Sequence, residues 1–294
     1  MNFKTTIQNL IPGWSGKLMA HMVAWFGETS GGVEKVHRVS RYQSNNLTVV
    51  SNQLSLMQQM GFDGVCLTVQ GPTVNPVLQE ATIMIWEECM ERDMLFAFVL
   101  DQWIAKGQPN PTQAVITALQ SPSYQQILAS PCYVPGGDIL EFDLANSAGV
   151  DVATVQAAFP NNPILSWHTG YSWPNPPAQA NSDTDLIAIL KADNAKPTMK
   201  FAGVCLGFNN GGVPLPAGVM APQFTGTRNY SLDVWGTGDA TTDIDHQAGN
   251  YFLDQIAVTP ATVPYICQVT WNDHDEQTAI EQFAAMFYGV RLGA

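Results

Sequence analysis

Polar and acidic residues gather directly behind one apolar run near the C-terminal end of the sequence. The run is Tyr265–Trp271, and five polar residues follow it without a break: Asn272, Asp273, His274, Asp275 and Glu276. A buried strand that ends in clustered carboxylates is how a (β/α) barrel presents catalytic acids at its C-terminal rim. The acidic residues of this cluster are therefore candidates for general acid and base chemistry.

The same acidic cluster has two other interpretations. An apolar helical pattern follows it, so Asp275 and Glu276 could lie in a solvated turn at a helix N-terminus, where the helix dipole favours negative charge. A metal site is the second alternative, but the spacing fits neither a calcium loop nor a zinc motif. We expect no metal and no organic cofactor.

Further polar and aromatic residues stand at the ends of other apolar runs, where side chains of parallel strands reach a common edge. Asp101 ends one run, and His21 lies within the first. Aromatic faces can stack on sugar rings, although any single one more often packs in a core. The residues expected to contact a substrate are His21, Asp101, Trp103, Trp167, His168, Tyr171, Trp235, Trp271 and Asn272.

Short apolar runs alternate with amphipathic helical stretches, a pattern typical of parallel strands joined by helices. Expected strands are Leu18–Phe26, Gly64–Val69, Met94–Leu100, Ile139–Leu144, Pro163–His168, Phe201–Phe208, Gly218–Gln223 and Tyr265–Trp271. Expected helices are Leu47–Met60, Pro76–Met90, Pro111–Leu119, Tyr124–Ala129, Val152–Phe159, Asp183–Lys191 and Asp243–Ile256, with a glycine-rich insertion at Thr225–Thr242. About eight strands and no visible linker predict one domain over residues 1–294, an α/β chain folded as a single (β/α)8 TIM barrel.

An open doubly wound sheet is the alternative fold. It would usually carry a glycine fingerprint for phosphate after its first strand. The segment Gly27–Gly32 (GETSGG) is glycine-rich but matches neither GxGxxG nor GxxxxGK[ST]. The closed barrel is the better prediction, and a nucleotide is not an expected ligand.

The charge balance excludes some partners. The 294 residues include 12 Lys and Arg against 25 Asp and Glu, for a net charge of −13. Nucleic acid and anionic membranes need basic surface, so we expect neither as a partner, whereas a neutral polysaccharide is compatible. The sequence starts without the apolar stretch of a signal peptide, and no later run approaches the length of a membrane helix. It does not indicate an oligomeric state.

Five cysteines are widely spaced, without a CxxC or other metal-type pattern: Cys66, Cys89, Cys132, Cys205 and Cys267. Three of them lie in apolar runs, which favours buried free thiols over disulfides. Free thiols favour a reducing compartment, but the sequence assigns no definite location.

Several segments resemble one group of enzymes. Val269–Glu276 (VTWNDHDE) is similar to the TWND-x-x-E signature of glycoside hydrolase family 71, the fungal α-1,3-glucanases, and Asn272–Glu281 (NDHDEQTAIE) parallels the NEWHEGTQIE signature of the related family 99, the endo-α-mannosidases. Ala20–Gly27 (AHMVAWFG) resembles the first-strand AHxMVG motif. Tyr42–Leu67 follows the family pattern into the second strand, and Phe96–Asp101 (FAFVLD) matches the third.

The resemblance implies a TIM-barrel glycosidase that cleaves an α-linked polysaccharide, with α-1,3-glucan expected first and α-mannan as a further alternative. It implies Glu276 as general acid/base, Asp273 as the second carboxylate, and a substrate or loop contact for Glu281. His274, Gln277 and Thr278 depart from the two signatures beside the reacting sugar. These departures keep open a non-enzymatic alternative, a carbohydrate-binding or structural assembly protein on a glycosidase-derived barrel.

Overall fold

A computed structural model describes residues 2–24, 43–71, 76–142, 144–167, 183–205 and 250–272 of the chain. These residues form one parallel sheet of seven strands in the order β5-β4-β3-β2-β1-β7-β6. The strands are β1 (Lys17–Met22), β2 (Gly64–Val69), β3 (Leu95–Leu100), β4 (Ile139–Glu141), β5 (Ile164–Ser166), β6 (Phe201–Cys205) and β7 (Tyr265–Val269). The class expected from the sequence, α/β with parallel strands, is confirmed.

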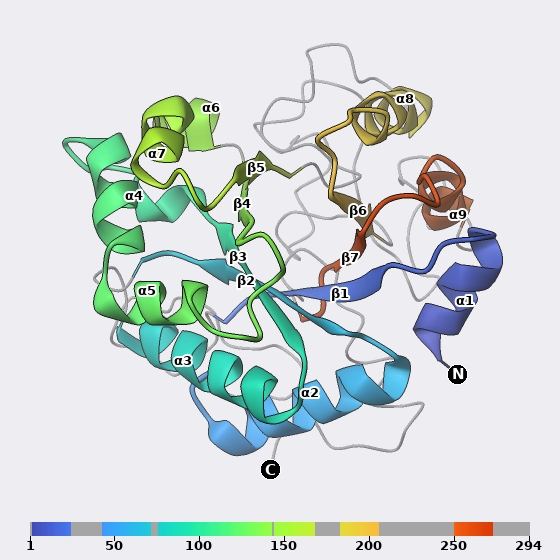
Figure 1. Ribbon diagram of the computed structural model, residues 1–294, viewed down its shortest axis with the longest axis horizontal. Helices are drawn as coiled ribbons and strands as arrows, with labels where there is room; N and C mark the ends of the chain where they lie inside the picture. The colour runs from blue at the N-terminus through green and yellow to red at the C-terminus, as the bar shows by residue number, and fades with distance from the viewer. Residues whose placement is uncertain are drawn as a thin grey trace, which may run out of the picture.

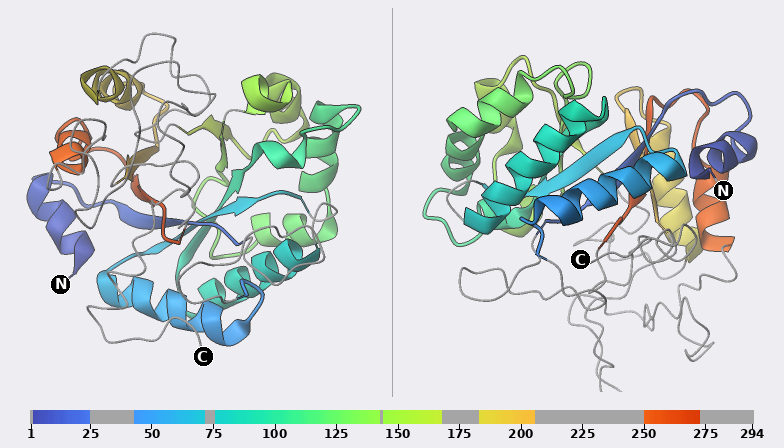
Figure 2. Two further views of the ribbon diagram at one scale, coloured as in Figure 1. Left: turned by 180° about the vertical axis from the view of Figure 1, so that it is seen from behind. Right: turned by 90° about the horizontal axis from the view of Figure 1, so that it is seen from below.

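Helices lie around the outside of the curled sheet (Figure 1 and Figure 2). They are α1 (Phe3–Leu10), α2 (Leu47–Met60), α3 (Pro76–Glu91), α4 (Pro111–Leu119), α5 (Pro122–Leu128), α6 (Leu144–Ala148), α7 (Val152–Ala158), α8 (Asp183–Asn194) and α9 (Asn250–Ala257), with the 3-10 turn η1 (Gln102–Ile104) after β3. The helices α2 and α3 pack side by side against the outer face of the strands.

Local signals explain why helices form where the sequence predicts them. Asn46 accepts a hydrogen bond from the Val49 amide at the start of α2, and Gly61 ends that helix with a φ of 91°. Asn110 caps α4 in the same way, with Pro111 in its first turn. Asn2 caps α1, which was not expected from the sequence because its eight residues precede the first strong apolar run.

Several strands are shorter than the sequence predicts. The first strand ends at Met22 rather than Phe26, and β5 has only three residues, Ile164–Ser166. β4 ends at Glu141, because Leu144 starts α6 instead of extending the strand. β7 ends at Val269, since the chain leaves the ladder before Trp271. Apolar residues continue past the end of a strand when a following turn or helix also packs on the core.

The sheet curls so that distant strands face each other. His21 on β1 aligns with Cys66 on β2, and residues aligned across parallel strands project to the same face. The His21 ring meets the Trp167 ring, which directly follows β5, edge-on with centroids 4.9 Å apart. β1 and β5 are four positions apart in the sheet order, so this contact spans the inside of the curled sheet. The described residues therefore form seven strands of a barrel-like sheet rather than a complete ring of eight.

β6 and β7 pair directly from Phe201–Tyr265 to Cys205–Val269. No strand therefore lies between β6 and β7 in the sheet. The segment Gly218–Gln223, expected to form a seventh strand, and the insertion Thr225–Thr242 lie outside the described residues. So do the first residues of the expected helix Asp243–Ile256.

An ion pair links the two ends of the sheet order, where β5 and β6 are not paired with each other. Lys200, just before β6, donates to the fully buried Asp138, just before β4, at 2.6 Å. A cavity of about 340 Å³ lies between β4–β5 and the segment that leads into β6, lined among others by Trp167, Lys200 and Phe201. The ion pair and the cavity mark the seam of the sheet.

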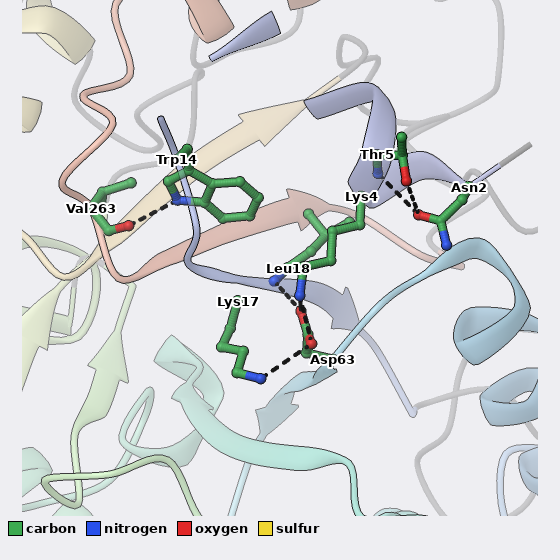
Figure 3. A network of polar contacts seen from close by, with 8 residues as sticks. All are labelled: Asn2, Lys4, Thr5, Trp14, Lys17, Leu18, Asp63 and Val263. Atoms are coloured by element: carbon green, nitrogen blue, oxygen red, sulfur yellow. Dashed lines mark hydrogen bonds and ion pairs between the residues drawn. The ribbon is translucent and has the colours of Figure 1, made fainter. Parts of the chain in front are cut away.

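A second ion-pair network lies at the N-terminal end of β1 and β2 (Figure 3). Asp63, just before β2, accepts from the Lys4 ammonium of α1 at 2.7 and 2.8 Å and from the Leu18 amide of β1 at 2.8 Å. The Trp14 indole donates to the Val263 carbonyl at 2.9 Å, which joins the α1–β1 connection to the segment before β7. These contacts stabilise the barrel at the end away from the expected catalytic rim.

Cys66, Cys89, Cys132 and Cys267 are buried free thiols, as expected from the sequence. Burial raises the pKa of Cys89 and Cys267 well above the ordinary value, which keeps both thiols protonated and unreactive. Within the part of the chain described here, no helix combines the length and apolarity needed to cross a membrane.

Candidate functional site

Four of the residues expected to contact a substrate, His21, Trp167, Trp271 and Asn272, lie at the C-terminal ends of β1, β5 and β7. These ends share one rim of the sheet, because all the strands are parallel. In barrels of this kind the C-terminal rim carries the active site. The geometry around each side chain shows whether it is available for a ligand.

His21 is buried inside the curled sheet, with 9% of its surface exposed. Its Nε2 lies 2.7 Å from the Thr68 hydroxyl of β2, while its Nδ1 has no hydrogen-bond partner. Burial lowers the pKa of His21 to about 3, because a charged imidazolium would lose its hydration there. The ring is therefore neutral at physiological pH and offers one unpaired nitrogen.

Trp167, whose ring lies against that of His21, carries a second unpaired polar atom. The side chain is 2% exposed, its ring packs edge-on against His21, and its indole Nε1 has no acceptor. The backbone N–H of Trp167 donates to the Glu141 carbonyl at 3.0 Å, which holds the residue in line with β4. The structure thus brings together two residues that are 146 positions apart in the sequence, and it leaves a nitrogen unsatisfied on each.

Asn272 clamps the end of β7 to the end of β1. Its amide oxygen accepts from the Val23 N–H at 2.9 Å, and its amide nitrogen donates to the Val23 carbonyl at 2.8 Å. The side chain is fully buried. Asn272 therefore extends the contact between the two strands beyond their last paired residues.

Trp271 belongs to the core. It is fully buried, and its ring meets the Phe62 ring edge-on with centroids 5.9 Å apart. Its backbone N–H donates to the His21 carbonyl, which continues the contact between β7 and β1. The structure gives Trp271 a packing role and presents no open face of its ring to a sugar.

Asp101 and Trp103 lie on the rim beyond β3. One Asp101 oxygen accepts from the Trp103 N–H at 2.8 Å and caps the turn η1. Trp103 is 49% exposed, and the Lys106 ammonium lies over its ring at 4.2 Å from the centroid. One ring face thus contacts a cation, while the exposed indole is a candidate platform for a sugar ring.

Two buried polar residues near the rim were missed from the sequence. Glu141, at the end of β4, accepts from the Leu144 N–H at 2.9 Å and so supports the start of α6. Thr68 was hidden in the apolar run GVCLTV, where a threonine is common for its β propensity. The position of Glu141 at the end of an expected strand could have identified it from the sequence. Thr68 is recognised only from its contact with His21.

The expected catalytic pair and several partners lie outside the described residues: Asp273, Glu276, Glu281, His168, Tyr171 and Trp235. Their roles stay predictions. Among the residues that the structure does describe, no three His, Cys, Asp or Glu side chains group in a way that could hold a metal ion.

A scan against models of known protein families finds no match, and a search of curated proteins also finds none. Several solved structures share the fold of this chain. Two structures of the endo-α-mannosidase of glycoside hydrolase family 99 from Bacteroides thetaiotaomicron superpose with a TM-score of 0.54 each. They are 13% and 12% identical in sequence and cover 92% and 91% of this chain and 87% and 88% of theirs.

A third structure, described as a glycoside hydrolase-like protein, has a TM-score of 0.52 at 8% identity and covers 91% of this chain and 87% of its own. The chain therefore shares the fold of family 99 endo-α-mannosidases across most of its length. No match to a family 71 enzyme is among these structures.

Proposed function

We propose that this protein is a glycoside hydrolase that cleaves an α-linked polysaccharide, with Glu276 as general acid/base and Asp273 as the second carboxylate. The observation that carries the proposal is the Asn272 clamp, because Asp273 is the next residue in the chain. The clamp holds Asn272, the residue that precedes the acidic segment in the sequence, at the rim beside β1. The fold shared with family 99 enzymes supports the same reading.

The two carboxyl groups need different protonation states to act. One must hold a proton for the leaving oxygen, and the other must be ionised to act as base or nucleophile, or to assist attack by the sugar's own 2-hydroxyl as in family 99. Burial and neighbouring charge would have to separate their pKa values for this purpose. His21 would supply a neutral hydrogen-bonding group and no positive charge.

Two polysaccharides are candidate substrates. The TWND-x-x-E resemblance favours α-1,3-glucan, whereas the superposed solved structures are endo-α-mannosidases, which favours α-mannan. We retain α-1,3-glucan as the first candidate from the sequence and α-mannan as the second from the fold.

Release of reducing sugar from α-1,3-glucan, α-mannan and α-1,4-glucan tests the proposal. We expect release from one polymer in the wild type and a loss of at least about a hundredfold in Glu276→Gln, because general acid catalysis contributes about 10² to 10⁴ to such rates. Asp151→Asn is the matched control, since Asp151 is an exposed cap of α7 whose loss should leave activity unchanged.

Other outcomes would overturn the assignment in distinct ways. Activity that survives in Glu276→Gln would show that the acid lies elsewhere. No release from any polymer between pH 4 and 8 would contradict a glycosidase. Large particles seen by light scattering in such an inactive protein would favour the structural assembly alternative.

A further inference from the structure

Thr68 and His21 form a buried pair whose role the reaction chemistry does not assign. Thr68 is 4% exposed on β2, two residues beyond the position that aligns with His21 of β1. Residues two apart in a strand share a face, so the Thr68 and His21 side chains both lie on the inside of the curled sheet, where His21 also contacts Trp167. Their 2.7 Å separation is that of a short hydrogen bond.

Because His21 is neutral, its tautomer decides which ring nitrogen donates and which accepts a hydrogen bond. A neutral imidazole carries its proton on one nitrogen and accepts with the other. With a pKa of about 3, His21 stays in this state across the physiological range. The hydroxyl of Thr68 can either donate to Nε2 or accept from an Nε2–H.

Counting unsatisfied groups selects one tautomer. Within the described part of the chain, His21 Nε2 is the hydrogen-bond partner shown for the Thr68 hydroxyl. If Nε2 carried the proton, the Thr68 O–H would lose its acceptor and Nδ1 would lack a donor. If Thr68 donates to Nε2, the Nδ1–H alone remains unpaired. Each buried unsatisfied group costs about 1–3 kcal/mol, so the second arrangement is favoured.

We propose that Thr68 is a positioning residue that holds His21 as the Nδ1–H tautomer, and that Nδ1–H and the Trp167 indole N–H together bind a hydroxyl oxygen of a neutral sugar. Both groups are donors, so their ligand must offer an acceptor. Neither carries a charge, and the chain is acidic overall, so a carboxylate would be buried without a counter-charge. The identity of the ligand as a sugar rests on the proposed function, whereas the tautomer of His21 does not.

The tautomer is measured directly by nitrogen-15 NMR of the imidazole rings at pH 7, with His21→Gln used to assign the His21 signals. We expect a protonated Nδ1 in the wild type. Thr68→Ser should keep it because the hydroxyl remains, whereas Thr68→Val should shift the population toward Nε2–H. A protonated Nε2 in the wild type, or identical spectra in the valine and serine variants, would overturn the inference.

The ligand is tested by titrating the α-1,3-linked disaccharides of glucose and mannose into labelled Glu276→Gln protein. We expect one of them to shift the His21 Nδ1 and Trp167 Nε1 signals, and Thr68→Val to weaken its binding about tenfold, the effect of losing roughly one hydrogen bond. Thr68→Ser should restore binding. Binding without a change at either nitrogen, or no binding, would refute this ligand. An inactive wild type with the expected tautomer would instead refute the proposed function alone.

Discussion

At the scale of the residue, His21 should make the stability of this protein depend on pH. Its folded pKa of about 3 lies below the ordinary value of 6.5, so between these values the unfolded chain binds a proton that the folded chain does not. The free energy of unfolding should therefore fall as the pH drops from 6.5 toward 3, by up to about 1.4 kcal/mol per pH unit, and this contribution should be constant above 6.5. Urea unfolding of the wild type and His21→Gln from pH 4 to 8 checks this. If the free energy of unfolding changed with pH in the same way in both proteins, this prediction would be wrong.

At the scale of the element, Asp63 ties α1, β1 and β2 together (Figure 3). Asp63→Ala leaves the Leu18 N–H without its acceptor and Lys4 without its counter-charge, so we expect a loss of about 2–4 kcal/mol in the free energy of unfolding. Asp63→Asn keeps an acceptor for Leu18 and should lose about half as much. Asp151→Ala, which removes an exposed helix cap, should cost about 1 kcal/mol and is the control in the same urea titrations. Equal losses in Asp63→Ala and Asp151→Ala would show that the Asp63 network stabilises the protein no more than one exposed helix cap does.

At the scale of the whole molecule, the Lys200–Asp138 ion pair spans the seam where β5 and β6 are not paired. Asp138 is fully buried, so Lys200→Met should destabilise the protein by about 2–4 kcal/mol by leaving a carboxylate without its partner. Adding Asp138→Asn to Lys200→Met should recover more than half of that loss, because no buried charge then remains. A double-mutant cycle in thermal unfolding measures the coupling. If the free-energy losses of Lys200→Met and Asp138→Asn simply add in the double variant, the two side chains are not coupled and the ion pair does not stabilise this junction of the sheet.

Local signals in the sequence determined much of the fold. The apolar periodicity of Leu47–Met60 and the glycine that follows it located α2. The apolar runs at Gly64–Val69 and Tyr265–Trp271 located β2 and β7, because periodicity depends on neighbouring residues. The run Tyr265–Trp271 also located Asn272 at the end of the last strand. These features need no knowledge of distant parts of the chain.

The tertiary structure alone decided which residues meet. The sheet order placed β6 against β7, the register of β1 on β2 brought His21 to Thr68, and the curl of the sheet brought His21 to Trp167. The sequence identified Asn272 as a rim residue, but only the fold showed that it binds the Val23 backbone. Such contacts join residues far apart in the chain, and their geometry follows from strand register and sheet curvature, which no local pattern of residue types encodes.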